Sequence, residues 1–183
     1  LKEEVQDGEF MCIHDATVDR TTDGKGAVAE MTLAQLKQLS AFYGKPGFEA
    51  ERIPTLAELA AILPPDVALA LELKTDRFLE LQVVKDLVCQ LEKAGIRERV
   101  IVLSFSLARI QAVHAYAPDI PMGWINLTRI APLKEPQLLG PFWPLLILNP
   151  FFVWLAHRRG QLVAPLDTTP EGRAWYYRLL KCD

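Results

Sequence analysis

The chain has few of the residues that mark specialised classes of protein. Only three of its 183 residues are cysteines, and none is spaced from another as metal-binding cysteines are. An odd and scattered set of cysteines supports neither a disulfide framework nor a zinc site. We therefore expect isolated thiols in a reducing compartment, which favours a cytoplasmic location. The three residues are Cys12, Cys89 and Cys182.

A surplus of basic charge is also absent. The chain has 20 Lys and Arg residues against 23 Asp and Glu residues, a formal net charge of −3. Because the basic residues are scattered as well, we expect no nucleic-acid partner. No G-x-G-x-x-G or Walker-type loop follows any predicted strand, which argues against the nucleotide-binding sheets.

The longest hydrophobic run is too short to cross a membrane. Residues Pro141 to Ala156 are fewer than the roughly 20 residues that a spanning helix needs, and Pro144, Asn149 and Pro150 interrupt them. We predict a buried strand that runs into a helix here. The alternative is a segment that docks on a membrane surface through its aromatic side chains.

Strand and helix patterns alternate from about residue 66 onward. Residues 66–74 predict a strand with Val67, Leu69, Leu71 and Leu73 on one face. A helix over 77–95 should end at Gly95. Further along we predict strands at 99–105, 121–127, 144–149 and 161–166, and helices at 106–116 (capped by Ser106), at 151–159 and after Pro170. Earlier, Thr32 and Thr55 should each open a short helix, and Thr55 with Glu58 fits a capping box.

This alternation predicts a parallel α/β fold in one domain over residues 1–183. The choice lies between an open doubly wound sheet and a closed (β/α)8 barrel. A closed barrel needs eight strands, typically in about 250 residues, and roughly six are visible in the pattern. If the fold is a barrel, it is incomplete in this chain.

The strand at 66–74 has a second face that carries charge near its end. Ala68, Ala70, Glu72 and Lys74 point away from the aliphatic side chains. In a barrel, Glu72 and Lys74 would project inward at the carboxyl end of the strand, where active sites of barrels lie. A buried carboxylate and ammonium need each other or a ligand. The pair is therefore either a structural ion pair or a metal-binding Glu beside a phosphate-binding Lys.

A second candidate ends the apolar run at residues 10–14. His14 follows the turn signal Asp7-Gly8, stands beside Asp15 and precedes a polar loop. A histidine in this position suits proton transfer near neutral pH, and the alternative is a structural role. We expect Asp15 and Arg20 to brace the loop, and the glycines at positions 24 and 26 to let it turn.

Three segments together resemble the glycerophosphodiester phosphodiesterase family. They read IHDATVDRTTDGKGAVAEMTLAQLKQL, then IPTLAELAAIL followed by LALELKT, then VIVLSFSLARIQAVHAYAPDIPMGW, and they span Val5 to Trp124. The resemblance implies a TIM-type (β/α)8 barrel and an enzyme of lipid and glycerol metabolism. It also implies metal-dependent hydrolysis of a small-molecule glycerophosphodiester to an alcohol and sn-glycerol 3-phosphate.

The resemblance also implies roles for individual residues. The family uses two histidines as general acid and base, and His14 matches the second. Three carboxylates hold one divalent ion, Mg²⁺ or Ca²⁺; Glu72 matches one of them, and Lys74 matches the lysine beside metal and phosphate. Phe105 and Trp124, near strand ends, would line the glycerol pocket unless they belong to the core.

The chain departs from the family pattern at both ends. A strand ending in H-R-G, which carries the first catalytic histidine, is absent, and alignment on Val5 puts Lys2 and Glu4 where an E-x-D metal pair belongs. Of these two, only Glu4 is suited to bind a metal. Near the other end, the segment VAPLDTT replaces a W-T-V type strand. We expect a larger polypeptide whose first and last barrel strands, and a loop between Gln6 and Asp7, are missing here.

Two alternatives to this hydrolase remain open. One is a phospholipase D-type enzyme that acts on lysophospholipids or sphingolipids, which exposure of residues 141–156 beside the site would favour. The other is a non-catalytic homologue that keeps the barrel and binds a phosphate ligand. Lys2 is the direct support for this second alternative.

Overall fold

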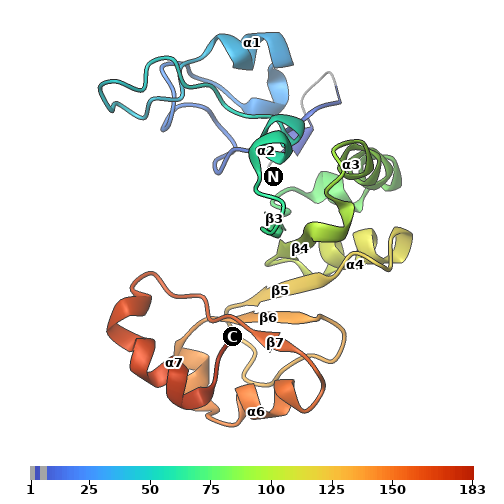
Figure 1. Ribbon diagram of the computed structural model, residues 1–183, viewed down its shortest axis with the longest axis vertical. Coiled ribbons are helices and arrows are strands. Elements are labelled where there is room, and N and C mark those ends of the chain that lie inside the picture. The colour runs from blue at the N-terminus through green and yellow to red at the C-terminus, as the bar shows by residue number, and fades with distance from the viewer. Residues whose placement is uncertain (1–2, 5–7) are drawn as a thin grey trace. The chain divides into compact units, whose positions relative to one another are not determined.

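The computed structural model describes residues 3–4 and 8–183 of the chain. It divides into two compact units, Leu1–Val100 and Ile101–Asp183, whose elements are labelled in Figure 1. The prediction of one domain over the whole chain stays a prediction. Among the described residues, no helix combines the length and the apolar character that a bilayer span requires.

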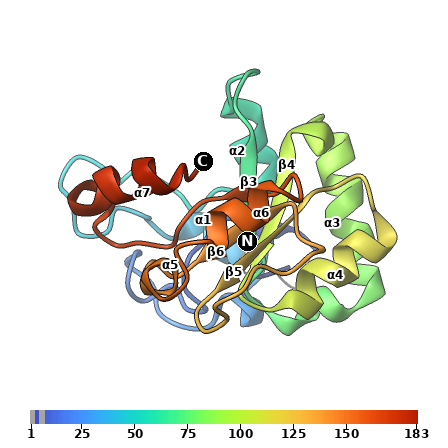
Figure 2. The ribbon, with the colours of Figure 1, turned by 90° about the horizontal axis from the view of Figure 1, so that it is seen from below.

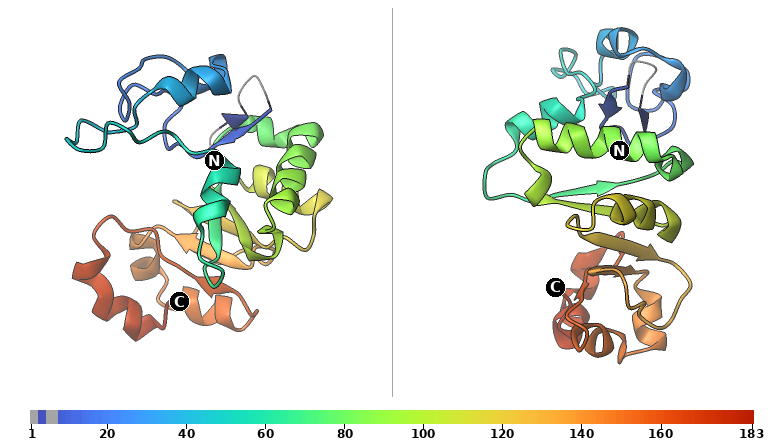
Figure 3. Two further views of the ribbon diagram at one scale, coloured as in Figure 1. Left: turned by 45° about the horizontal axis from the view of Figure 1, so that its top comes forward. Right: turned by 90° about the vertical axis from the view of Figure 1, so that its right-hand side faces the viewer.

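The first unit begins with a short antiparallel pair of strands, in which Glu3 lies opposite Met11 and Glu4 opposite Phe10. The long connection between its first two helices is mostly exposed and loops away from the body of the unit (Figure 3). In chain order the unit contains β1 (Glu3–Glu4), β2 (Phe10–Met11), a 3-10 turn (Val28–Glu30), α1 (Leu33–Gln38), α2 (Leu56–Ile62), β3 (Leu69–Glu72), a 3-10 turn (Asp76–Leu79), α3 (Leu81–Lys93) and a 3-10 turn (Arg97–Arg99).

Local signals set the helix boundaries of this unit. Thr32 and Thr55 both form complete capping boxes, each with the side chain three residues further on, which satisfies backbone N–H groups at the helix start. At the other end of α3, Gly95 has a φ of +67°, the left-handed conformation that glycine adopts most easily. The predicted helix starts at Thr32 and Thr55 and the stop at Gly95 are confirmed. The helix predicted over 77–95 begins later, at Leu81, after a 3-10 turn at Asp76–Leu79.

The strand β3 is shorter than the predicted strand at 66–74. Its alternation is confirmed at the carboxyl end, where Leu71 and Leu73 are buried while Ala70 is exposed. Val67 is exposed because its N–H bonds to the carbonyl of Pro64 in a turn instead of a sheet. A separate core cluster lies under the loop after β2 and consists of Met11, Val18, Val28, Leu36 and Ile53.

The second unit is built on parallel strands that pair in the order β4-β5-β6-β7. In register, Trp124 pairs with Leu139 and Leu139 with Val163, so these side chains share one face of the sheet. They pack with Phe152, Val153 and Ala156 of α6 into one cluster. The elements are β4 (Val100–Ser104), α4 (Leu107–Tyr116), β5 (Met122–Asn126), β6 (Leu138–Pro141), α5 (Pro144–Leu148), α6 (Phe152–His157), β7 (Leu162–Val163), a 3-10 turn (Pro170–Arg173) and α7 (Ala174–Leu180).

Two predictions for the second unit are wrong. Residues 144–149, predicted as a strand, form the helix α5, and the strand lies earlier, at β6, as Figure 2 shows. Pro144 occupies the first turn of α5, where its fixed φ suits a helix, and the adjacent Leu145 and Leu146 are both buried instead of alternating. Ser106 does start α4 but makes no cap with its side chain; its N–H bonds to the hydroxyl of Ser104.

The segment 141–156 is consequently a pair of short helices and not a buried strand that runs into a helix. The predicted helix at 151–159 is confirmed as α6. The alternation of strands with helices along both units confirms the predicted α/β class.

Candidate active site

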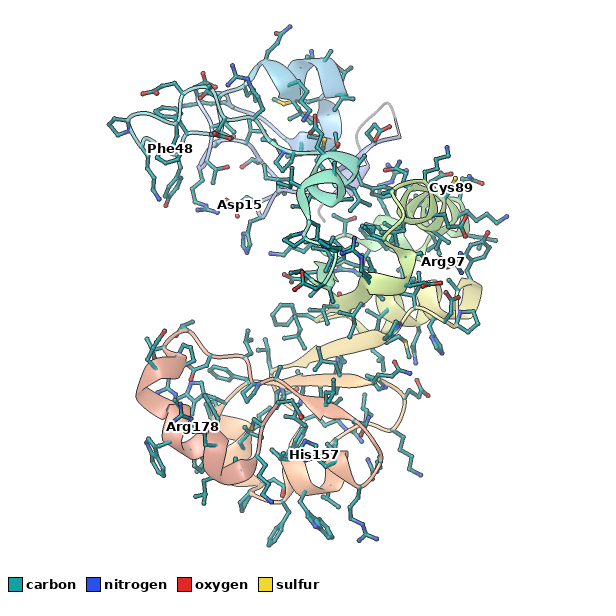
Figure 4. The ribbon with its side chains drawn as sticks, viewed as in Figure 1. Asp15, Phe48, Cys89, Arg97, His157 and Arg178 are labelled. Atoms are coloured by element: carbon teal, nitrogen blue, oxygen red, sulfur yellow. The ribbon has the colours of Figure 1, made fainter. Side chains whose placement is uncertain are left out.

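His14 lies just after β2, at the start of the polar loop. The N–H of Cys12 donates to the carbonyl of Pro54 at 2.9 Å, which fixes the chain two residues earlier. Nδ1 of His14 lies 2.6 Å from Oδ1 of Asp15, and Nε of Arg20 donates to Oδ2 of Asp15 at 2.5 Å. Asp15, labelled in Figure 4, thus joins an imidazole and a guanidinium through its two oxygens.

This arrangement determines which nitrogen of His14 is available. The hydrogen bonds from Arg20 and from His14 hold the pKa of Asp15 well below its usual range, so the carboxylate is ionised at neutral pH. An ionised carboxylate only accepts, so Nδ1 of His14 carries the proton and donates it. In the neutral imidazole the lone pair then lies on Nε2, on a side chain that is 71% exposed. It is placed to accept a proton from, or return one to, a bound molecule.

The loop around His14 is braced from several directions. The guanidinium of Arg20 lies 5.5 Å from the ring centre of Tyr43, and the N–H of Val18 donates to the carbonyl of Gly26 at 3.0 Å. Gly26 has a φ of +123°, as predicted for a turn glycine. Gly24 has another role: a Cβ there would lie 2.6 Å from Cδ2 of Leu39, so this glycine permits close packing.

Glu72 is the last residue of β3, Lys74 follows two residues later, and the two side chains contact each other. Nζ of Lys74 lies 3.3 Å from Oε2 of Glu72, and the two side chains are 17% and 29% exposed, respectively. This is the ion pair that the first of the two interpretations predicted. Because both side chains keep some access to solvent, the contact is also compatible with a ligand that binds to either charge.

The donor set for a divalent cation is incomplete in the described part of the chain. Mg²⁺ and Ca²⁺ take six or more oxygen ligands, with carboxylates among them. Within residues 3–4 and 8–183 the structure groups no three His, Cys, Asp or Glu side chains that would hold a metal. Glu72 supplies one carboxylate, whereas Lys2 and the side chain of Glu4 lie outside the described residues.

The two aromatic candidates lie in the second unit and contact each other. Nε1 of Trp124 donates to the carbonyl of Phe105 at 3.2 Å. Phe105 is 45% exposed just after β4, so it is not a core residue. Trp124 is half-buried against the cluster under α6 and also lines a cavity of about 180 Å³ together with Leu103 and Ile125.

A buried charged network in the second unit was not predicted from the sequence. The side chain of Asp167, 1% exposed, accepts from Nε of Arg173 at 2.7 Å and from Nη2 at 2.5 Å. The hydroxyl of Tyr177 donates to the same carboxylate, and Arg173 stacks 4.0 Å over the ring of Trp143. Arg173 holds the pKa of Asp167 well below its usual range, while burial and the bond to Asp167 raise the pKa of Tyr177 to about 12.

This network ties α7 to the end of β7. Its signal in the sequence is an Asp directly after a strand with an Arg six residues later, which is too common a pattern to be specific.

The chain is similar to known proteins along most of its length. Residues 5–164 match the model of the glycerophosphoryl diester phosphodiesterase family. A glycerophosphodiester phosphodiesterase of Caldanaerobacter subterraneus is 33% identical over 150 residues, which cover 80% of this chain and 60% of that protein. One of Bacillus subtilis is 29% identical over 132 residues, or 63% and 44% of the two chains. The chain thus spans less than two thirds of the length of these relatives.

Solved structures show the same fold. A phosphodiesterase of Oleispira antarctica, solved in complex with the product sn-glycerol-3-phosphate, matches with a TM-score of 0.77 at 24% identity over 94% of this chain and 73% of that one. A glycerophosphodiester phosphodiesterase of Agrobacterium tumefaciens matches with a TM-score of 0.75 at 21% identity, over 100% and 79%. The predicted TIM-type fold is confirmed, and the chain corresponds to part of such a barrel.

Proposed function

The chain belongs to the glycerophosphoryl diester phosphodiesterase family, and we propose that the protein containing it hydrolyses glycerophosphodiesters to an alcohol and sn-glycerol 3-phosphate. The observation that carries this proposal is the arrangement of His14, Asp15 and Arg20. A carboxylate that is itself held by an arginine orients the imidazole and leaves Nε2 open to a substrate. Proton transfer by such a group is what breaking a phosphate ester bond requires.

In this proposal His14 is one of two imidazoles that move protons. A hydroxyl of the substrate's glycerol attacks phosphorus, its proton goes to one imidazole, and the bond from phosphorus to the leaving alcohol breaks. The other imidazole gives its proton to the leaving oxygen, so an alcohol and a cyclic phosphate result. Water then opens the ring with the two roles reversed, which restores both imidazoles. Asp15 acts as a positioning residue because it fixes the tautomer of His14.

Glu72 and Lys74 are the groups that we assign to the phosphate and its counter-ion. A divalent cation, Mg²⁺ or Ca²⁺, offsets the negative charge of a phosphodiester when it is bound. We propose that Glu72 is one of its carboxylate ligands and that Glu4 is another. Lys74, 3.3 Å from Glu72, would then turn to the phosphate as a second positive charge. Phe105 and Trp124 are proposed to contact the glycerol group.

A phospholipase D-type activity on lysophospholipids or sphingolipids is the second candidate function. The observation that favours it is the exposure of Ile147, Leu148 and Phe151 within residues 141–156, at 58%, 71% and 66%. Apolar side chains at the surface suit a substrate that carries an acyl chain. A homologue that binds a phosphate ligand without turnover is the third candidate.

One assay separates the three functions. The intact protein is incubated with glycerophosphocholine or with lysophosphatidylcholine, each with Mg²⁺, with Ca²⁺ and with EDTA. The release of glycerol 3-phosphate and of choline is measured. We expect metal-dependent release of glycerol 3-phosphate from glycerophosphocholine, which is lost in EDTA and restored by excess metal. Turnover of lysophosphatidylcholine alone would favour the second function.

Binding of glycerol 3-phosphate with no turnover of either compound would favour the third function. Turnover that is the same with metal and with EDTA would contradict the assignment of Glu72 as a metal ligand. The assay therefore tests the reaction and the metal separately.

A further inference from the structure

The second unit exposes apolar side chains that its own core does not use. Six of them lie between residues 127 and 154, and each is more than half exposed, from 51% for Leu127 to 71% for Leu148. We call this set the apolar rim. It consists of Leu127, Ile130, Ile147, Leu148, Phe151 and Trp154.

Hydrogen bonds join the two segments that carry the apolar rim. Nδ2 of Asn149, between α5 and α6, donates to the carbonyl of Ile130 at 2.7 Å. The loop after β5 is in turn held by Asn126, whose buried side chain donates to the carbonyl of Arg129 and accepts from the N–H of Thr128. These bonds hold the loop after β5 against the connection between α5 and α6.

The helices α5 and α6 are apolar on both faces. Their inner face is formed by Leu145, Leu146, Phe152, Val153 and Ala156, all buried. The outer face is apolar as well. Phe151, the N-cap of α6, and Trp154 within it are three residues apart, so both exposed side chains lie on one side of this helix. A helix that is hydrophobic all round belongs in a core or in contact with lipid, and here the outer face is open to solvent.

Basic side chains lie in the same segments as the apolar rim. The guanidinium of Arg158 lies 4.9 Å from the ring centre of Trp154, and Arg159 donates to the carbonyl of Pro132 at 3.0 Å. A groove of about 490 Å³ beside the loop after β5 is lined by Arg129, Lys134 and Arg159, with Glu135 as its one acidic residue. Residues 127–159 thus hold four basic side chains and one acidic side chain, although the whole chain has a net charge of −3.

We propose that the apolar rim docks on the surface of an anionic lipid bilayer. Leucine, phenylalanine and tryptophan would enter the boundary between headgroups and acyl chains, where tryptophan is the favoured anchor. Arg129, Arg158 and Arg159 would contact the lipid phosphates, and their stems would cover apolar surface. We choose an anionic membrane over an uncharged groove of a partner protein because lipid phosphates supply counter-charges for these basic residues. An uncharged groove would supply none. The proposal concerns binding alone and does not depend on the proposed reaction.

The test is co-sedimentation of the intact protein with vesicles. Two compositions are used, pure phosphatidylcholine and an equimolar mixture of phosphatidylcholine with phosphatidylserine, each at low and at high salt. We expect binding to the mixed vesicles that weakens in high salt, and less binding to phosphatidylcholine alone. Replacing Leu148 by Ser should lower the partition coefficient about tenfold, because one buried apolar side chain is lost. Arg158→Gln should lower it less, and only with the anionic lipid.

The chain offers a matched control for each variant. Leu179 is 70% exposed and Arg178 is also exposed, and both lie on α7 outside the apolar rim. Leu179→Ser and Arg178→Gln should therefore leave vesicle binding unchanged, and all four variants should unfold at the wild-type temperature. The label of Arg178 in Figure 4 marks the position of this control helix.

Several outcomes would overturn the proposal. One is a wild-type protein that stays in the supernatant with both kinds of vesicle. Another is equal loss of binding in Leu148→Ser and Leu179→Ser. A third is light scattering that shows a dimer which Leu148→Ser dissociates while no lipid binds, since the rim would then be covered by a second copy.

Discussion

The two units each contain a histidine bonded to an aspartate, and the two pairs differ in what surrounds them. In the first unit, His14 lies 2.6 Å from Asp15; in the second, His157 lies 2.8 Å from Asp183 (Figure 4). Asp15 is bonded further by an arginine, whereas Asp183 accepts from the N–H of Val163 in β7. The His14 side chain is 71% exposed and that of His157 is 34% exposed.

The distance between histidine and aspartate is similar in the two pairs, so it does not reveal what either pair does. Asp183 connects His157 of α6 to Val163 of β7, so this pair holds two elements of the unit together. Asp15 is held from its other side by Arg20 within one loop, and it turns the imidazole outward. We propose that the second bond of the carboxylate and the exposure of the ring distinguish a histidine that takes part in a reaction from one that stabilises the structure.

The two units also differ in the sign of their net charge. Residues 1–100 hold twelve basic and eighteen acidic side chains, whereas residues 101–183 hold eight basic and five acidic ones. We propose that the groups that transfer protons and hold the cation lie in the acidic unit, and that lipid contact lies in the basic unit.

The largest effect should come from Glu72→Gln in the first unit. Removing a carboxylate ligand should lower activity by about a hundredfold or more and raise the metal concentration needed for half-maximal rate. The measurement is the release of glycerol 3-phosphate over a titration of Mg²⁺. Glu80→Gln is the matched control, since Glu80 also pairs with a basic neighbour, Arg77, at 3.6 Å. Equal metal titrations of Glu72→Gln and wild type would exclude Glu72 as a ligand.

A smaller loss of activity should follow from Asp15→Asn. The amide cannot hold the tautomer of His14 as a carboxylate does, so kcat should fall by about 10- to 100-fold and the pH–rate profile should shift. The thermal midpoint should change little, because an exposed ion pair contributes little stability. An unchanged profile with a lowered midpoint would make Asp15 a structural residue.

Asp167→Asn should lower the free energy of unfolding and leave activity unchanged. The loss of stability should be largest at neutral pH and should shrink in acid. Because Arg173 depresses the pKa of Asp167 in the folded state, the stabilisation is complete above the unfolded pKa of about 4 and is lost as pH falls toward the folded pKa. The free energies of unfolding of wild type and variant should therefore differ at neutral pH and converge below about pH 4. Urea titrations over a pH series measure this. A difference that persists unchanged in acid would contradict it.

The smallest effect should come from Gly123→Ala in β5. A Cβ at this position would lie 2.0 Å from Cδ2 of Leu103, the movable end of a side chain, so the cost should be about 1–3 kcal/mol in the free energy of unfolding. Gly172→Ala is the control, as a Cβ there meets nothing within 4 Å. Leu103→Ala in the same chain should recover part of the loss. Equal stability of Gly123→Ala and Gly172→Ala would contradict the close approach of the Leu103 side chain to Gly123.

Features that depend on neighbouring residues could be predicted from the sequence. The helix start at Thr32, the capping box at Thr55 and the stop at Gly95 need only a few residues of context, and all three are confirmed. The positions of His14, Glu72 and Lys74 at strand ends follow from short apolar runs. Their catalytic roles remain proposals.

Features set by the rest of the fold could not be predicted. Residues 138–141 contain a glycine and a proline and make a weak strand by themselves, but they pair with β5 on one side and β7 on the other. Residues 144–149 have an apolar composition that fits either structure, and burial of the adjacent Leu145 and Leu146 decides for a helix. The contacts of Asp167 depend on how α7 folds back, which no spacing reveals.

The most direct test of the central claim compares the two histidine pairs in one assay. His14→Ala and His157→Ala are prepared in the intact protein, and the release of glycerol 3-phosphate from glycerophosphocholine is measured with saturating Mg²⁺. We predict that His14→Ala lowers kcat at least about a hundredfold at an unchanged thermal midpoint, while His157→Ala retains the rate and loses stability. Near wild-type turnover by His14→Ala would contradict the assignment of His14 to the reaction.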